Sequence, residues 1–227
     1  MELTPRLACI ARQVPAGCRF VDVGTDHAYL PVSLLLDGVL ERAIAADLRS
    51  GPLERARQTA LQYGVQDRIS FRLCDGLSGV STEEADVIAI AGMGGDTIAA
   101  ILAEAPWTRQ PGKLLLLQPM TATFSLRSWL WNHAYQIERE VIAREGKRLY
   151  SIWTVSGGES PPWSLGELWA GRQSEDPLRG AYLAQRIAKA EKALQGHLAA
   201  VQREEKTIEM LQGILEELYP MKEERMT

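Results

Sequence analysis

The chain has 227 residues and a formal net charge of −4; 46% of its residues are hydrophobic and 24% are charged. This composition excludes a disordered chain, and the length suits one α/β core with an appended segment. No apolar run approaches the ~20 residues of a membrane span, and residues 1–6 lack the basic-then-apolar order of a signal peptide. We therefore expect a cytoplasmic protein with no membrane partner. Cys9, Cys18 and Cys74 have no paired spacing, which favours buried thiols and no metal.

Basic residues are concentrated in one part of the chain. Residues 109–150 carry 7 basic and 3 acidic side chains, whereas the segments on either side carry more acidic than basic residues. This segment is a candidate contact for a polyanion such as RNA. A solvated basic helix face is the alternative explanation of the same pattern.

The segment 19–31 predicts a strand, a tight turn and the start of a helix. An apolar run around Asp22 ends at Gly24, and polar residues then lead into leucines at helical spacing, Leu30, Leu34 and Leu35. The amino end of such a helix carries unpaired N–H groups and faces the carboxyl end of the strand. We interpret the segment as the first βα turn of a nucleotide-cofactor fold.

Two further buried strands lead to carboxylates. Residues 43–47 end in Asp47, 23 residues after Gly24, close to the interval expected for the acid that binds the ribose hydroxyls of an adenosine cofactor. A helix cap or strand-end turn is the alternative interpretation of Asp47. Residues 69–74 lead to Asp75 and Gly76, which would accept from an adenine amino group or form a simple turn.

A glycine-rich segment follows the fourth predicted strand. Residues 86–91 run directly into Gly92, Met93 and Gly94, where bare backbone would face a ligand above the sheet. We interpret this segment as part of the site, with a tight turn as the alternative. Residues 113–118 predict a fifth buried strand that closes at Gln118.

The order of the predicted elements distinguishes between cofactor folds. After residue 118 the sequence predicts a helix over 125–133 and two strands, 136–144 and 148–155, joined at a glycine-centred hairpin. Five strands with helical crossovers followed by a hairpin is the order of the methyltransferase sheet rather than that of a dehydrogenase. We therefore predict an α/β fold, a Rossmann-like seven-stranded class I methyltransferase sheet, over residues 1–156.

The carboxyl-terminal part, residues 162–227, is predicted to be a helical coiled coil after a linker over 156–163. Apolar residues recur there every seven positions, at Ile187, Leu194, Val201, Ile208 and Leu215. The second apolar position of the heptad is occupied by the polar residues His197 and Glu204. We therefore expect the chain to reverse near 197–206 and form an antiparallel helical hairpin in a monomer. One unbroken helix is the alternative, and it would need a partner chain and give a dimer.

Acidic residues favour one cofactor over another. Asp26 occupies the second glycine position of a Gly-x-Gly turn, where a carboxylate would repel the pyrophosphate of NAD. Asp22, Asp26, Asp47 and Asp75 all lie at or near predicted strand ends, and such neighbours stabilise a sulfonium cation. The pattern therefore favours S-adenosyl-L-methionine as the cofactor.

Three motifs carry a resemblance to a known family. Residues 22–31 read DVGTDHAYLP, residues 91–95 read AGMGG and residues 117–119 read LQP. Together with the helical tail they resemble the bacterial tRNA (adenine-22-N1)-methyltransferase family over essentially the whole chain. The resemblance implies transfer of a methyl group from S-adenosyl-L-methionine to N1 of an adenine in tRNA. One position departs from it, because Met120 stands where members have asparagine.

The resemblance and the strand-end positions together define the expected site. Cofactor binding is expected of Asp22, Gly24, Asp26, His27, Asp47, Leu48, Asp75, Gly76, Ala91 and Gly92. Catalysis is expected of Asp26, Gly92, Met93 and Gly94. RNA contact is expected of His27, Tyr29, Gln118 and Pro119 and, from charge, of Arg127, Arg148, Lys189 and Lys192, with Arg139, Arg144, Lys147, Arg179 and Arg186 as further basic candidates.

The expected chemistry follows from the acceptor atom. Adenine N1 has a lone pair at neutral pH and needs no base, so positioning and electrostatics would supply the catalysis. The target base must be turned out of any pair that occupies N1. Three rival functions are a nicotinamide oxidoreductase, which Asp26 disfavours, a noncatalytic RNA-binding module, and a small-molecule methyltransferase, which the basic segment disfavours.

Overall fold

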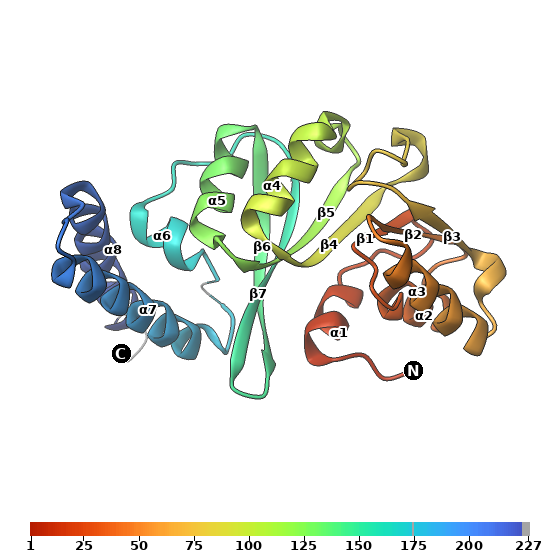
Figure 1. Cartoon of the computed structure of the whole chain (residues 1–227), viewed down its shortest axis with the longest axis horizontal. Helices are drawn as coiled ribbons and strands as arrows, with labels where there is room; N and C mark the ends of the chain where they lie inside the picture. The colour runs from red at the N-terminus through yellow and green to blue at the C-terminus, as the bar shows by residue number, and fades with distance from the viewer. Residues whose placement is uncertain (174, 224–227) are drawn as a thin grey trace.

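A seven-stranded sheet forms the centre of the computed structural model, which describes residues 1–173 and 175–223 (Figure 1). The strand order is β3-β2-β1-β4-β5-β7-β6, with β1 to β5 parallel and β7 antiparallel to both β5 and β6. The strands are β1 (Phe20–Val23), β2 (Ala43–Asp47), β3 (Ile69–Leu73), β4 (Val87–Gly94), β5 (Leu114–Thr121), β6 (Tyr135–Glu145) and β7 (Arg148–Gly157). This order confirms the predicted methyltransferase sheet.

The centre of the sheet contains the point where the chain changes direction. From β1 the chain winds outward through β2 and β3, and it then returns to add β4 and β5 on the other side of β1. Phe20 therefore pairs with Ala43 of β2 on one side and with Val87 of β4 on the other. Ligands of open α/β sheets bind at the carboxyl ends of the strands at such a switch point. The topology alone thus places the candidate site above β1 and β4.

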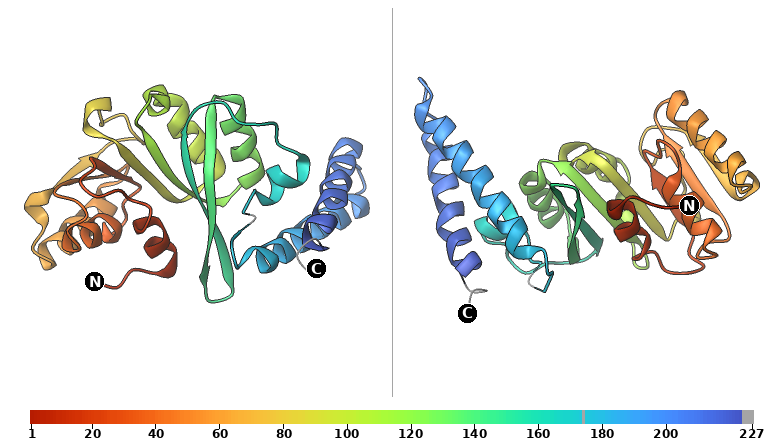
Figure 2. Two further views of the ribbon diagram at one scale, coloured as in Figure 1. Left: turned by 180° about the vertical axis from the view of Figure 1, so that it is seen from behind. Right: turned by 90° about the horizontal axis from the view of Figure 1, so that it is seen from below.

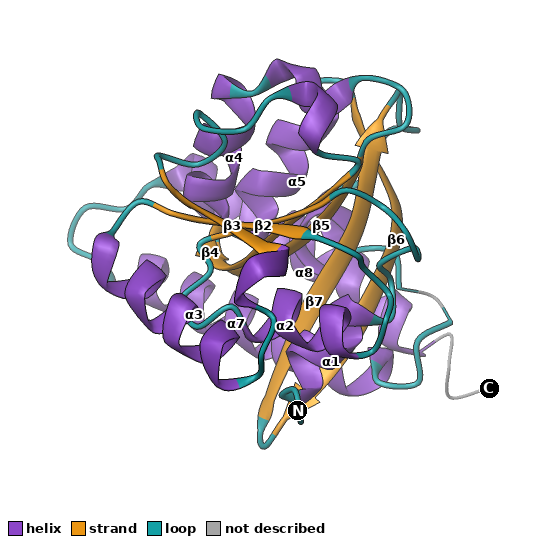
Figure 3. Cartoon of the chain, turned by 90° about the vertical axis from the view of Figure 1, so that its right-hand side faces the viewer, coloured by secondary structure: helices purple, strands orange, loops and turns teal. Residues whose placement is uncertain are grey.

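Helices cover both faces of the sheet (Figure 3). On one face lie α1 (Pro5–Ala11), α2 (Tyr29–Leu36) and α3 (Ser50–Gln62), and on the other lie α4 (Gly95–Glu104) and α5 (Thr123–Asn132). Successive strand residues point to opposite faces, so Phe20 packs into the first core and Val21 into the second. In the part of the chain that the structure describes, no helix is long and apolar enough to cross a membrane.

The hairpin formed by β6 and β7 extends beyond the rest of the sheet (Figure 1). Its two strands have 11 and 10 residues, and its turn contains Gly146, whose φ of 57° lies in the left-handed region. Helix α1 packs against β6 and β7, and the backbone N–H of Arg6 donates to Glu145 Oε1 at 3.0 Å. The first helix of the chain is thereby attached to the far end of the sheet.

The carboxyl-terminal helices form the expected antiparallel hairpin (Figure 2). After the short helix α6 (Leu165–Ala170), the hairpin consists of α7 (Arg179–Ala199) and α8 (Glu205–Glu223), and the reversal falls over residues 200–204, inside the predicted range. Leu183, Ile187 and Ala190 of α7 pack with Leu211 and Leu218 of α8 in a separate core. The seam of each helix is therefore covered within the chain.

The segment beyond residue 163 also contains a short helix that heptad spacing does not reveal. Helix α6 begins after Ser164, whose hydroxyl accepts from the N–H of Glu167 at 3.3 Å while the Glu167 carboxylate accepts from the N–H of Ser164 at 3.0 Å. This capping box is itself a sequence signal for a helix start. Helix α6 packs against both α5 and α8, so it connects the sheet region to the helical hairpin.

A buried ion pair holds this junction together and corrects one expectation. Arg127 of α5 is fully buried, its Nη2 lies 2.7 Å from Glu140 Oε1 of β6, and its Nη1 donates to Leu168 O of α6 at 3.0 Å. The expected contact between Arg127 and RNA is therefore wrong. Arg179 is also buried, and its Nη1 donates to Gln173 Oε1 at 3.2 Å, so it too fails as an RNA contact. Charge along the chain could not distinguish these two arginines from exposed ones.

Replacing Arg127 with leucine should destabilise the protein strongly. The substitution leaves the Glu140 carboxylate buried without its partner, which costs about 3–5 kcal/mol of unfolding free energy. Urea unfolding measures the change. Arg144→Leu, at an exposed residue of β6, the strand that carries Glu140, should change stability by less than about 0.5 kcal/mol. Equal effects of the two substitutions would contradict the structural role of the ion pair.

Candidate active site

A cavity of about 890 Å³ opens at the carboxyl ends of β1 to β4. Its walls come from the loops that follow β1, β2 and β3, from the last residues of β4, and from one side of α4. The predicted site residues that line it are Gly24, Asp26, Asp47, Leu48, Asp75, Gly76, Ala91, Gly92 and Met93. Residues that lie on four separate strand ends in the sequence thus meet at one site in the fold.

Two glycines allow the backbone to form the floor of this cavity. Gly24 begins the turn after β1 with a φ of 76°, and Gly92 near the end of β4 has a φ of 77°. A Cβ on Gly24 would overlap with the Cε of Met93, so a side chain at residue 24 would force Met93 to move. Both positions therefore favour glycine. Gly92 is favoured for its backbone conformation, and Gly24 both for its conformation and because the side chain of Met93 lies close to it.

Two carboxylates face the cavity from its other side. Asp47, at the end of β2, is buried, and its Oδ1 accepts from the N–H of Arg49 at 2.8 Å, which fixes the turn that follows. Asp75 follows β3 and is exposed to the cavity. Leu48 is 63% exposed although it is apolar, and it provides a nonpolar surface between the two acids. The arrangement combines hydrogen-bond acceptors with a flat apolar patch.

Asp22 lies beneath this cavity rather than in its lining. It shares the sheet face of Phe20, toward α1 and α2, because alternate strand residues point the same way. Burial raises the pKa of its carboxyl to about 6, and the nearby Asp47 carboxylate adds to the shift. Asp22 is therefore only partly ionised near pH 6, and any cofactor contact through it would be made from below the floor.

Asp26, His27 and Tyr29 form the outer rim of the site. Asp26 is paired with Arg55 of α3, whose Nε donates to Asp26 Oδ1 at 3.2 Å, and this contact lowers the pKa of the Asp26 carboxyl. The ring of His27 stacks on that of Tyr29 with centroids 5.0 Å apart and an angle of 4° between the planes. Both rings remain partly exposed, so they present an aromatic surface beside the cavity.

Gln118 supports the floor of the cavity from inside the protein. Its Oε1 accepts from the N–H of Gly92 at 3.1 Å and from Arg6 Nη1 at 2.8 Å, and the side chain is fully buried. The expected direct contact between Gln118 and RNA is therefore wrong, because this residue acts on Gly92. Its Nε2 lies 3.4 Å from the Sδ of Met120, the residue that departs from the family pattern. Pro119 is buried as well and lines a second cavity.

Several residues of the site were not anticipated from the sequence. Thr97, Ala100, Ile101 and Glu104 line the cavity from α4, and their spacing places them on one side of that helix. This spacing after a glycine-rich turn is a signal that could have identified them. The pairing of Arg55 with Asp26 joins residues far apart in the chain, and no local pattern predicts it.

The residues present fit an adenosine-bearing sulfonium cofactor. Bare backbone at Gly24 and Gly92 leaves room above β1 and β4, and Asp47 stands where ribose hydroxyls need an acceptor. Within residues 1–173 and 175–223, no group of three or more histidine, cysteine, aspartate or glutamate side chains is arranged to hold a metal ion. The strand order and this glycine-floored cavity define a class I S-adenosylmethionine-dependent methyltransferase.

Comparison with known proteins identifies the class and then the family. A family described as "Methyltransferase domain" matches residues 3–153. The tRNA (adenine(22)-N(1))-methyltransferase of Bacillus subtilis is 38% identical over 160 residues, which cover 70% of this chain and 67% of the relative. The chain belongs to the tRNA (adenine(22)-N(1))-methyltransferase family.

Solved structures agree with this assignment over nearly the full length. The crystal structure of the B. subtilis m1A22 tRNA methyltransferase has a TM-score of 0.85 and 28% identity, and the match covers 97% of this chain and 99% of that one. A candidate tRNA (m1A22) methyltransferase of Streptococcus pneumoniae, solved with S-adenosyl-L-methionine, has a TM-score of 0.80 and 32% identity, with 94% and 100% covered. The recognised family and S-adenosyl-L-methionine as its cofactor are therefore confirmed.

Replacing Gly24 with alanine should weaken cofactor binding by about tenfold, because Met93 must then move within the cavity that it lines. Calorimetric titration with S-adenosyl-L-methionine measures the effect. Gly64→Ala is the matched control, since Gly64 has a similar φ of 68° but open space around its Cβ position. Both variants should lose similar stability, and a similar loss of cofactor affinity in both would contradict the role given to Gly24.

The stability of the protein without cofactor should depend on the ionisation of Asp22. Its pKa rises from 3.8 in the unfolded chain to about 6 in the folded one, so ionisation of Asp22 opposes folding. The resulting loss of unfolding free energy is absent at pH values below 3.8, the pKa in the unfolded chain. It grows as the pH rises toward about 6, the pKa in the folded chain, and reaches about 3 kcal/mol above that pH. Urea unfolding from acid to neutral pH should show this loss in the natural protein and not in Asp22→Asn. If the unfolding free energies of the natural protein and of Asp22→Asn change with pH in parallel, the expectation is contradicted.

Proposed function

We propose that this chain transfers the methyl group of S-adenosyl-L-methionine to N1 of an adenine in tRNA, at position 22 as in its family. The observation that carries the proposal is the cavity at the β1/β4 switch point, where Gly24 and Gly92 leave bare backbone beneath a space lined by acids. Family membership gives the nucleotide, and the cavity gives the place of the reaction.

The cofactor would be held by the strand-end residues. Asp47 accepts from the ribose hydroxyls, and Leu48, Asp75, Gly76 and Ala91 surround the adenine. Gly24 and Gly92 admit the rest of the molecule close to the backbone, with Asp22 below. When bound, the cofactor supplies an electrophilic methyl group on a sulfonium.

The acceptor adenine would lie over Gly92, Met93 and Gly94, at the mouth of the same cavity. Its N1 attacks directly, because the lone pair is available at neutral pH, so this chain supplies orientation rather than a base. Asp26 is held as a carboxylate by Arg55 and can orient the adenine or balance the charge that develops on it. The Gln118 side chain fixes the position of the Gly92 backbone by accepting a hydrogen bond from its N–H.

The rim residues would receive the base as it leaves the RNA. N1 of a paired adenine is inaccessible, so the nucleotide must be turned out, at a cost of a few kcal/mol. The stacked rings of His27 and Tyr29 offer an aromatic surface of the kind on which unstacked bases rest. This assigns His27 a role in substrate contact as well as in the cofactor turn.

Residues 1–156 and 162–227 divide this work. The first part carries the cofactor and the target base, and the exposed Arg148, Lys189 and Lys192, with Arg139, Arg144 and Lys147, would contact RNA phosphates along the hairpin and α7. Because α7 and α8 cover each other's apolar seams, the chain needs no second copy and acts as a monomer. A tRNA substrate supports a cytoplasmic location.

Incubation with tritiated S-adenosyl-L-methionine and bulk tRNA, followed by nucleoside analysis, tests the proposal. Label should appear in 1-methyladenosine, and it should fall with Gly24→Ala but not with Gly64→Ala when cofactor is limiting. Transfer to another nucleoside or to a small molecule would assign a different substrate. Binding of tRNA without any transfer would favour the noncatalytic alternative.

A further inference from the structure

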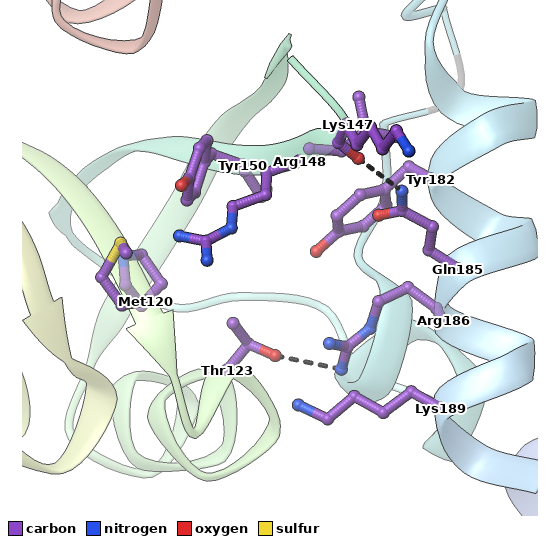
Figure 4. Close-up of a pocket in the computed structure, with 12 residues that line it drawn as sticks. Met120, Thr123, Lys147, Arg148, Tyr150, Tyr182, Gln185, Arg186 and Lys189 are labelled. Carbon is purple, nitrogen blue, oxygen red and sulfur yellow. Dashed lines mark hydrogen bonds between the residues drawn. The ribbon is translucent and has the colours of Figure 1, made fainter. Parts of the chain in front are cut away.

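A second cavity, of about 420 Å³, lies between the sheet region and the helical hairpin (Figure 4). One wall is formed by Lys147, Arg148 and Tyr150 of the β6–β7 hairpin, and the other by Arg186 and Lys189 with their neighbours on α7. The end of β5 and the start of α5 close its base. We call this space the basic cleft. The lining residues of its two walls, 147–151 and 182–189, lie at least 31 positions apart in the sequence.

The basic cleft collects positive charge without matching negative charge. Lys147, Arg148, Arg186 and Lys189 all line it, and its lining contains no carboxylate. Among the described residues, none of these four cations lies within ion-pair distance of an aspartate or glutamate. Elsewhere on the same chain arginines such as Arg55 and Arg72 are paired with acids. The cleft is therefore electrostatically complementary to an anion.

Arg186 shows that this charge is built in rather than accidental. Its guanidinium lies over the ring of Trp169 at 4.8 Å, and its Nη2 donates to Thr123 Oγ1 at 3.1 Å. Its Nε is buried and has no hydrogen-bond partner among the described residues. Burial lowers the pKa of Arg186, and that of Lys189 is lowered by burial and by Arg186 beside it. A buried cation with an unused hydrogen-bond donor destabilises the folded protein unless an anion binds to it.

The basic cleft and the cofactor cavity are connected through Gln118, although they have no lining residue in common. Pro119 and Met120 line the cleft directly after Gln118, whose side chain accepts from the N–H of Gly92 in the cofactor cavity. Arg6 donates to the same Gln118, and its guanidinium carbon lies 5.8 Å from the centre of the Tyr150 ring, which lines the cleft. The two cavities are therefore neighbours across the end of β5, which makes the cleft a candidate contact for the backbone of a nucleic acid that has one base in the first site.

We propose that the basic cleft binds a backbone phosphate of the RNA strand that carries the target adenosine. The inference rests on the proposed function, because that function brings RNA to the neighbouring cavity. The planar guanidinium groups of Arg186 and Arg148 can each donate paired hydrogen bonds to the oxygens of a phosphodiester, and Lys189 adds a single positive charge. The contact fixes the position of the strand without reading its sequence, so it sets the register of the base that enters the active site.

Two lysines of the helical hairpin provide a matched test by direct binding of fluorescent tRNA to the full chain. Lys189 of α7 lines the cleft and Lys206 of α8 does not, although both are exposed. Lys189→Gln should weaken tRNA binding by about tenfold and reduce the slope of log affinity against log salt by about 0.7 to 0.9. Lys206→Gln should weaken binding by less than about threefold. Equal effects of the two substitutions would show that only the overall charge of the chain matters and would overturn the proposal.

Arg186 supplies a second test that keeps the charge. Arg186→Lys retains a cation but loses the planar fork and its stacking on Trp169. At a temperature well below the melting temperature of the variant, it should weaken tRNA binding by about tenfold while cofactor affinity stays near that of the natural protein. Arg42→Gln, at the opposite rim of the sheet, should leave tRNA binding unchanged. Unchanged binding in Arg186→Lys overturns the role of the fork.

The outcomes separate this proposal from the proposed function. Cleft-dependent binding without methyl transfer would remove the function and keep the phosphate site. Methyl transfer with no difference between the two lysine variants would keep the function and remove the site. If the natural protein fails to bind tRNA, both fall, and preferential capture of an acidic peptide would assign the cleft to a protein partner instead.

Discussion

The whole site depends on bare backbone at the ends of two adjacent parallel strands. Gly24 after β1 and Gly92 in β4 both have a positive φ, and the side chain of Met93 fills the space that a Cβ on Gly24 would take. The buried Gln118 side chain of β5 then fixes Gly92 from behind by accepting its N–H. These contacts lie where the strand order changes direction, so the fold and the cavity have the same origin. The positions proposed for cofactor, acceptor and RNA are all described relative to this floor.

Only some of the acidic residues predicted at the strand ends present an unpaired negative charge to the cavity. Asp26 is paired with Arg55, and burial keeps Asp22 from full ionisation near pH 6. Among the described residues, the carboxylates that line the cavity without an ion pair are therefore Asp47 and Asp75 at the strand ends and Glu104 on α4. The sequence argument for a sulfonium cofactor therefore reached the correct cofactor, although only part of the counted charge is available to it. Burial and pairing, which decide that availability, depend on residues distant in the chain.

Local patterns predicted the strands, the sheet order and the helical reversal because each depends on spacing within a short segment. Strand-end residues such as Asp47 and Gly92 could also be placed, since parallel strands bring their carboxyl ends to one edge. Arg127 could not, because its burial depends on Glu140 and Leu168, which come from other elements. Gln118 was assigned to the right region and the wrong partner for the same reason, as its role depends on Gly92 and Arg6.

The buried contacts of Arg127 also join the helical hairpin to the sheet region. They attach α6 to both α5 and β6, and α6 in turn packs against α8, so the join is made by interior packing as well as by the connecting chain. Such packing limits how far the two walls of the basic cleft can separate. If RNA binds there as proposed, a folded RNA whose backbone already has the matching curvature would bind at a smaller entropic cost than an unstructured strand of the same nucleotides.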